Sequence, residues 1–322
     1  DAGERREHVE HARTIPCADD GDERGHADAD AEPMSAGRQM GGHFATRSIN
    51  EDGTWRNLTE QRNSSSDVSP TGSQMPRLLG LAMASKYFKQ NQDLQTAPYH
   101  KFSDKGNEIA FGTIGNASSS EGIFWEVMNA ACVMQVPLLM SVWDDGYGIS
   151  VPKKYQTTKE SVSEALAGMQ KQDDTNGIDI YKLKGWDYAG MCETLEFAIQ
   201  KIRDTHTPAL FHVEELTQPQ GHSTSGSHER YKTEFRLAWE KEWDCIKQMR
   251  KWILENGLAE EDELKEIEEN AVNYVRESKN KAWNKYHQPL KNLVGETIAQ
   301  LNSTISYHVA IQNIINELSA TR

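Results

Sequence analysis

The chain has 322 residues and carries 35 Lys and Arg against 49 Asp and Glu, a formal net charge of −14. No basic block or stripe interrupts this acidic balance, so nucleic acid is not expected as a partner. No run of about 18 apolar residues occurs, which gives no reason to expect a membrane. The four cysteines are scattered without a CxxC pair. This favours neither a zinc site nor a disulfide framework and predicts a cytoplasmic protein.

Residues 1–35 differ in composition from the rest of the chain, because they contain no Phe, Trp or Tyr and are crowded with charge. Such a segment can bury little apolar surface to offset its ordering entropy. We interpret it as a disordered or non-homologous extension. Its histidines, His8, His11 and His26, are more typical of a solvated tail than of a metal site.

From residue 66 onward, strand and helix patterns alternate. A loop feeds a helix near Met75, a short apolar strand ends at Gly115, and a Ser118 to Glu121 capping box predicts the next helix. The segment "VPLLMSVW" reads as a strand, and "IDIYKLKG", "GMCETLEFAIQKIRD" and "PALFHVEEL" repeat the alternation. This order predicts an α/β fold in which a parallel sheet is flanked by helices.

After residue 232 the strand patterns stop. One apolar stripe of helical spacing runs from Trp239 to Ile253 and ends at Asn256-Gly257, and the remaining segments also have helical patterns. We therefore predict an α/β domain over residues 36–232. Residues 233–322 are predicted to be a helical C-terminal region.

Two polar turns follow neighbouring strands of the predicted sheet, "GNASSSEG" after Gly115 and "WDDGYGIS" around Asp145. In a parallel sheet, one right-handed crossover returns the chain to the same edge, where such folds bind ligands. Oxygen ligands from both turns could hold Mg²⁺, and the intervening helix start could bind a diphosphate. The alternative is that Asn116, Asp144 and Asp145 are ordinary turn residues.

The stretch from Gly115 to Ser150 resembles the thiamin-diphosphate signature of 2-oxoacid dehydrogenases, in the alpha part of their decarboxylating component. "WDDGYGIS" is most similar to the Asn-Asn-Gly-Tyr of the branched-chain, or 2-oxoisovalerate, type. The blocks "AGRQMGGHF", "SPTGSQMP" and "GHSTSGSHERY" extend the resemblance to residues 36–250. Four blocks in order are a specific signal.

The resemblance implies that the side chains of Asn116 and Asp145 and the main-chain oxygen of Tyr147 bind magnesium. The family has an acid at the position of Asn116 and an amide at the position of Asp145, so acid and amide have exchanged places in this chain. The pair still carries one negative charge, and metal binding is expected to survive.

The resemblance also implies the residues that bind thiamin diphosphate, and they are Ser69, Thr71, Gly115, Ala117, Ser118, Trp143, Ile149 and His222. For Trp143 a core position is an alternative, and for Ser69 and Thr71 a helix N-cap is one. A monovalent cation, K⁺, is suggested at Ser73 and Gln74. His222 is the expected catalytic residue, and Ser223 matches a phosphorylation position of mitochondrial relatives.

The implied activity is oxidative decarboxylation of a 2-oxo acid with acyl transfer to the lipoyl group of an acyltransferase core. The family forms heterotetramers in which a beta part supplies the glutamate that activates the cofactor. No block here resembles that part, so we expect an alpha subunit or a truncated alpha-beta fusion. The amino-terminal Tyr-Arg pair of the family is also missing. The alternatives are a transketolase-like enzyme and an inactive partner-binding subunit.

Overall fold

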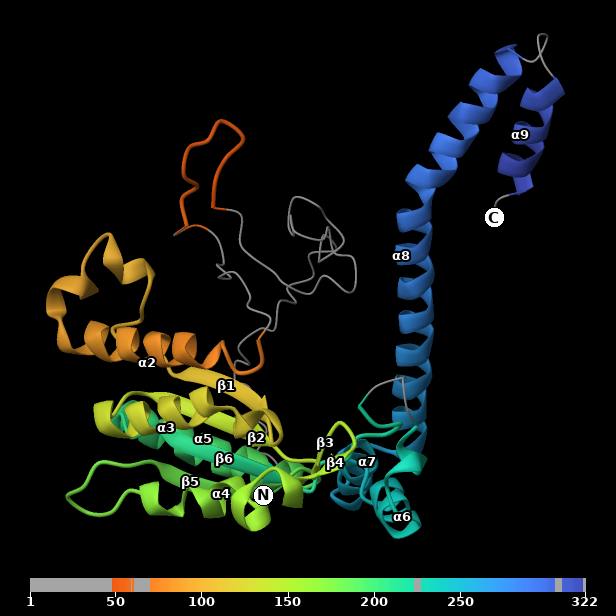
Figure 1. The fold of residues 1–322 in the computed structure, drawn as a ribbon. Coiled ribbons are helices and arrows are strands. Elements are labelled where there is room, and N and C mark those ends of the chain that lie inside the picture. The colour runs from red at the N-terminus through yellow and green to blue at the C-terminus, as the bar shows by residue number, and fades with distance from the viewer. Residues whose placement is uncertain (1–47, 59, 61–69, 223–226, 305–308, 321–322) are drawn as a thin grey trace. The chain divides into compact units, whose positions relative to one another are not determined.

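A computed structural model describes residues 48–58, 60, 70–222, 227–304 and 309–320 (Figure 1). By its contacts, the chain divides into residues 1–252 and residues 253–322. This division falls within the helix Cys245–Glu255, and the predicted boundary after residue 232 stays a prediction. The predicted extension over residues 1–35 and the block at 36–44 lie outside the described residues. Within the described ranges, no helix combines the length and apolar composition that crossing a bilayer requires.

The α/β unit contains a parallel sheet, as predicted, and its four strands have the order β1-β2-β6-β5. The strands are β1 (Ala110–Gly115), β2 (Leu138–Trp143), β5 (Asp179–Lys184) and β6 (Ala209–Glu214). The helices α2 (Met75–Gln90), α3 (Gly122–Met134), α4 (Val162–Ala165) and α5 (Tyr188–Thr205) surround it (Figure 1). The hairpin strands β3 (Tyr147–Gly148) and β4 (Val151–Pro152) were not predicted.

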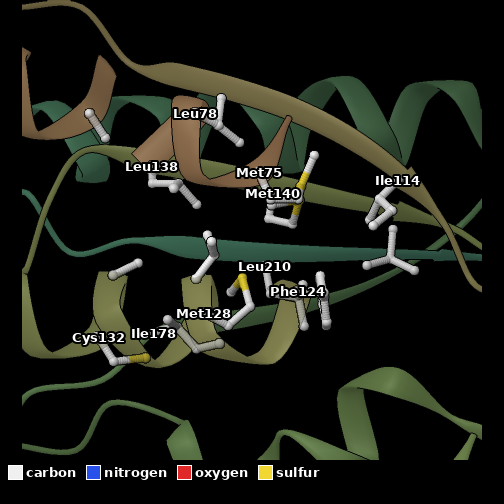
Figure 2. Close-up of a cluster of buried hydrophobic side chains, with 14 of the residues drawn as sticks. Met75, Leu78, Ile114, Phe124, Met128, Cys132, Leu138, Met140, Ile178 and Leu210 are labelled. Atoms are coloured by element: carbon white, nitrogen blue, oxygen red, sulfur yellow. The ribbon is translucent and has the colours of Figure 1, made fainter. Parts of the chain in front are cut away.

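The sheet separates two apolar clusters. The larger one joins α2, α3 and α4 to alternate residues of β1 and β2, and Figure 2 shows Phe124 and Met128 of α3 directed toward the sheet. The smaller one places Ala198 and Ile202 of α5 against the opposite face of β2, β5 and β6. Because both faces are covered, the two central strands β2 and β6 are near-continuous apolar runs, as buried parallel strands usually are.

After the sheet, the predicted single helical stripe from Trp239 to Ile253 is two helices, α6 (Glu234–Glu242) and α7 (Cys245–Glu255). The break falls at Trp243 and Asp244, where the Asp244 side chain accepts from the Lys247 N–H and begins a new helix. In the C-terminal unit, α8 (Glu261–Thr304) and α9 (Val309–Ala320) are helical, as predicted.

Candidate functional site

The two polar turns begin at the same edge of the sheet, because β1 and β2 are neighbours and run in parallel. Gly115 pairs with Trp143 at the ends of these strands, and the Asn116 N–H donates to the Trp143 carbonyl over 3.1 Å. The α3 crossover connects them, as the sequence predicted. The structure therefore brings Asn116 and the turn that contains Asp145 to one carboxyl edge.

Asn116 is buried without a partner for its side-chain amide. It is 3% exposed, and its Nδ2 atom forms no hydrogen bond with a described residue. The backbone at this residue is fixed, since the Ser119 hydroxyl donates to the Asn116 carbonyl over 2.6 Å. An unpaired buried N–H donor is uncommon and indicates a place for an acceptor, such as water or an oxygen of an anionic ligand.

Residues 144–148 form a turn in which two carboxylates bind backbone amides. The Gly146 N–H donates to Asp144 Oδ1 over 2.8 Å, and the Tyr147 N–H donates to Asp145 Oδ1 over 3.1 Å. Burial raises the pKa of Asp145, although the Tyr147 N–H and the nearby Lys232 and Arg236 oppose this effect. A buried carboxylate whose charge is poorly compensated is a suitable ligand for a cation.

The hairpin after this turn leaves the Tyr147 carbonyl available. The Lys153 N–H donates to the Gly146 carbonyl over 2.9 Å, so Gly146 and Lys153 form a hydrogen-bonded pair. Hydrogen-bonded and non-hydrogen-bonded residue pairs alternate along an antiparallel ladder. The next pair, Tyr147 and Pro152, is therefore a non-hydrogen-bonded pair. The Tyr147 carbonyl therefore points away from β4, as a main-chain metal ligand must.

Backbone strain marks the tip of the same hairpin. Ile149 has a φ of 58° and is exposed. A β-branched residue rarely adopts this left-handed conformation, which costs about 1–3 kcal/mol and occurs most often at ligand sites. The cofactor-binding role of Ile149 stays a prediction.

Close backbone approaches bring further predicted residues to the edge. A Cβ atom on Gly148 would lie 2.7 Å from the Ala117 Cβ, so the hairpin rests on the turn after β1. A Cβ on Gly72 would lie 3.1 Å from Ile123 at the start of α3, which places the neighbouring Thr71 beside that helix start. Only small or absent side chains permit both contacts.

The capping box predicted from Ser118 and Glu121 is wrong. Ser118–Ser120 form a separate 3-10 turn, and α3 begins at Gly122 with Glu121 as its N-cap. The Ser120 hydroxyl bonds to the Gln156 carbonyl over 3.2 Å, which is a tertiary contact that local propensity cannot report. The positive end of the α3 dipole lies at Gly122.

The structure decides between the alternatives for Trp143, which were a cofactor-site or a core position, and excludes the N-cap alternative for Thr71. Trp143 is 53% exposed and its indole N–H donates to Ser141 over 2.9 Å, so it is not a core aromatic. Thr71 is not an N-cap, because α2 is capped at Gln74. Ser69 and Ser223 lie outside the described residues, and the ligand roles of these residues stay predictions.

His222 is linked to the edge through its backbone. The Tyr231 hydroxyl bonds to the backbone of His222, and the Tyr231 ring lies 5.7 Å from the Tyr147 ring. The imidazole of His222 is exposed. The structure therefore connects the segment that bears His222 to the turn around Asp145.

A buried polar network beneath the edge was not predicted. The Ser163 hydroxyl lies 2.8 Å from His212 Nδ1, His212 Nε2 lies 3.0 Å from Asp144 Oδ2, and Lys153 Nζ lies 2.8 Å from the same oxygen. Burial alone raises the pKa of Asp144, but the bonds from His212 and Lys153 outweigh it and lower the pKa. A histidine within the apolar strand "ALFHVE" was the available signal.

Glu214 lies close to Asp144 and His212, so the three could supply metal ligands. Asp144 and His212 are already bound to Lys153 and Ser163, and a buried polar network whose members have partners makes the local structure rigid.

The residues at the edge fit a magnesium ion and a diphosphate. The buried Asn116 amide, the Asp145 carboxylate and the Tyr147 carbonyl are hard oxygen donors, and Mg²⁺ usually takes a few such ligands together with phosphate and water. The first N–H groups of α3 have no partner within the helix and favour an anion.

These features define an α/β protein in which two polar turns meet at the carboxyl edge of a parallel sheet. A family model described as the dehydrogenase E1 component matches residues 38–291. The chain belongs to this family.

Similar proteins of known name are alpha subunits. A Rickettsia bellii protein named pyruvate dehydrogenase E1 component subunit alpha is 27% identical over 64% of this chain and 56% of its own length. A mitochondrial 2-oxoisovalerate dehydrogenase subunit alpha of Caenorhabditis elegans is 25% identical over 87% of this chain and 58% of its own length. The 2-oxoisovalerate dehydrogenase subunit alpha of Bacillus subtilis is 24% identical over 79% of this chain and 66% of its own length. The chain thus spans little more than half the length of several relatives it matches.

Proposed function

We propose that this chain is the alpha part of the decarboxylating component of a 2-oxoacid dehydrogenase complex. It would bind thiamin diphosphate through Mg²⁺ and act with a beta part on a 2-oxo acid, with the acyl group passing to the lipoyl arm of an acyltransferase core. Family membership supports this role. The observation that carries the proposal is that Asn116 and the Asp145–Tyr147 turn follow two hydrogen-bonded parallel strands at one edge.

In this proposal the chain positions the cofactor and its metal. Asn116, Asp145 and the Tyr147 carbonyl hold magnesium, and the start of α3 with Ala117 and Ser118 faces the diphosphate. When bound, the thiazolium ring supplies the electron sink for loss of carbon dioxide.

The remaining predicted residues stay proposals. His222 would hold or move a proton near the acceptor, since imidazole titrates near neutrality. Phosphorylation at Ser223 would add negative charge beside the diphosphate. Ser73 and Gln74 would hold K⁺, and the complex would be a cytoplasmic heterotetramer.

The exchanged ligand pair offers a direct test of the metal site. The single variant Asp145→Asn removes the only carboxylate of the pair, and we expect magnesium-dependent thiamin diphosphate binding to weaken by at least about tenfold. The double variant Asn116→Asp with Asp145→Asn restores one charge in the arrangement of the family, and affinity should recover. Titration calorimetry on the full chain with its beta part measures both, and Asp173→Asn, an exposed acid, is the matched control.

The same preparation tests the reaction. Carbon dioxide release from pyruvate and from 2-oxoisovalerate, with an artificial electron acceptor, should require thiamin diphosphate, Mg²⁺ and the beta part together. Turnover of sugar phosphates instead would establish a transketolase-like enzyme. Failure of the assembled protein to bind the cofactor would establish a partner-binding subunit without catalysis.

A further inference from the structure

Helix α6 and the residue before its N-cap carry a buried ion network next to the 144–148 turn. Lys232 Nζ lies 2.8 Å and 2.9 Å from the two carboxylate oxygens of Glu240, and the side chains are 1% and 5% exposed. Arg236 Nε donates to Glu240 Oε1 over 2.8 Å. One carboxylate thus binds two cations that are largely removed from water.

Arg236 connects this network to the turn. Its Nη2 donates to the Asp145 main-chain oxygen over 2.8 Å, and to the Leu216 carbonyl over 3.4 Å. Its guanidinium carbon lies 5.7 Å from the centre of the Tyr147 ring. The guanidinium is planar and its donors are fixed relative to one another, so the bond to Glu240 sets where Nη2 points.

Lys232 supports the same turn from the aromatic side. Its ammonium lies 5.1 Å from the Tyr147 ring centre and 5.9 Å from the Tyr231 ring centre. These distances are within the range of cation-π attraction. Since Tyr231 bonds to the backbone of His222, the network joins the turn to the segment that bears this histidine.

The network meets the turn through one charged donor. Lys232, Arg236 and Glu240 together carry one positive charge, and the guanidinium of Arg236 presents it to the Asp145 main-chain oxygen. A charge-assisted hydrogen bond from a donor held in place by Glu240 favours one position of the turn. The resemblance assigned no role to Arg236 or Glu240, because their positions lie beyond the Gly, Ser and Thr rich block.

We infer that Arg236 is a positioning residue for the proposed metal-binding turn: it holds the Asp145 main-chain oxygen, and Glu240 holds Arg236 in place. As a consequence, the turn has its metal-binding conformation before the cofactor binds. This consequence rests on the proposed function. Preorganisation of this kind lowers the cost of binding.

The test uses the full chain without cofactor and compares Arg236→Met with the wild type. Hydrogen exchange is followed in the 144–150 segment, where the N–H groups of Gly146 and Tyr147 are bonded to the side chains of Asp144 and Asp145. We expect exchange in this segment to accelerate by about tenfold or more, while β2 and β6 keep their protection. Lys241→Met removes an exposed cation from the same helix and is the matched control.

A second measurement separates positioning from general stability. Magnesium-dependent thiamin diphosphate binding should weaken in Arg236→Met by about 10-fold or more. Arg236→Lys keeps the charge but loses the planar guanidinium with its several donors, so its affinity should lie between that of Arg236→Met and that of the wild type. Unchanged exchange in 144–150, or equal acceleration in β2 and β6, overturns the inference. If the wild type binds no cofactor, the proposed function fails, and the exchange comparison still decides whether Arg236 positions the turn.

Discussion

The two units of the chain differ in how their helices are stabilised. In the α/β unit, the sheet and its helices share two clusters of fully buried side chains. In the C-terminal unit, Leu264 and Ile315 are the buried apolar residues among the side chains that the structure describes, while Tyr274, Trp283 and Leu293 are exposed. Helices in proteins derive most of their stability from an apolar face that packs. The α/β unit therefore has its own core, whereas few of the described side chains of α8 and α9 are buried within this chain.

The contrast also explains where the candidate site lies. Buried ions such as Asp144, Lys232 and Glu240 belong to the α/β unit, because a packed core can hold charged groups away from water in fixed positions. The following predictions test this contrast, in order of decreasing effect.

The largest effect is expected in the core beneath the site. Phe124 is fully buried between α3 and the sheet, and Phe124→Ala should lower the free energy of unfolding of the α/β unit by about 3–5 kcal/mol. Chemical denaturation followed by tryptophan fluorescence measures this loss. Phe235→Ala is the control, because Phe235 is 82% exposed and its removal should change little. Similar losses for both variants would contradict the assigned core.

A smaller effect is expected for the buried network. Asp144→Asn keeps the shape but weakens the bonds to His212 and Lys153, and we expect a loss of about 1–3 kcal/mol at neutral pH. The pKa of Asp144 is lowered from its ordinary value of 3.8, so its stabilisation is present above that value and is lost as the pH falls through the folded-state pKa. The difference between variant and wild type should shrink in acid. A difference that does not depend on pH would show that the charge is not involved.

The opposite sign is expected for Asp145. Its pKa is raised by burial, so the ionised carboxylate destabilises the fold above the raised pKa, and this cost disappears as the pH falls through that pKa toward the unfolded value. Asp145→Asn should therefore stabilise the metal-free chain by about 0.5 kcal/mol at neutral pH, even as it weakens magnesium binding. Thermal unfolding without and with Mg²⁺ and thiamin diphosphate measures both. Loss of stability without metal would contradict the assigned burial cost.

The smallest effect tests the independence of the units. Leu264→Ala removes a buried residue of the C-terminal unit, and hydrogen exchange in β2 and β6 should remain at the wild-type rate. Exchange in α8 should accelerate. Faster exchange in both units would show that they unfold together.

Much of the fold could be predicted because its signals are local. The apolar strand that ends at Gly115, the strand after Pro137 and the amphipathic helix between them have periodicities that sequence alone reveals. Parallel strands joined by such helices place their carboxyl ends together, so the convergence of the Asn116 and Asp145 turns was also predictable.

Other features depended on contacts between distant residues. Ser118 and Glu121 have the spacing of a capping box, but the contact of Ser120 with Gln156 supports a 3-10 turn instead. That outcome is not present in local propensity. The division of the stripe from Trp239 to Ile253 is different, because it comes from a local contact: Asp244, a favoured N-cap residue, begins a new helix.

The sequence by itself determined the alternation of strands and helices, the family, and the residues that can offer oxygen ligands, because these depend on residue type and spacing. Only the tertiary structure showed that Ser163, His212 and Asp144 form a buried chain, and that Arg236 and Glu240 hold the Asp145 turn. The physical reason is that the charge and orientation of a buried group are set by its neighbours in space, and those neighbours come from strands, helices and loops that are far apart in sequence.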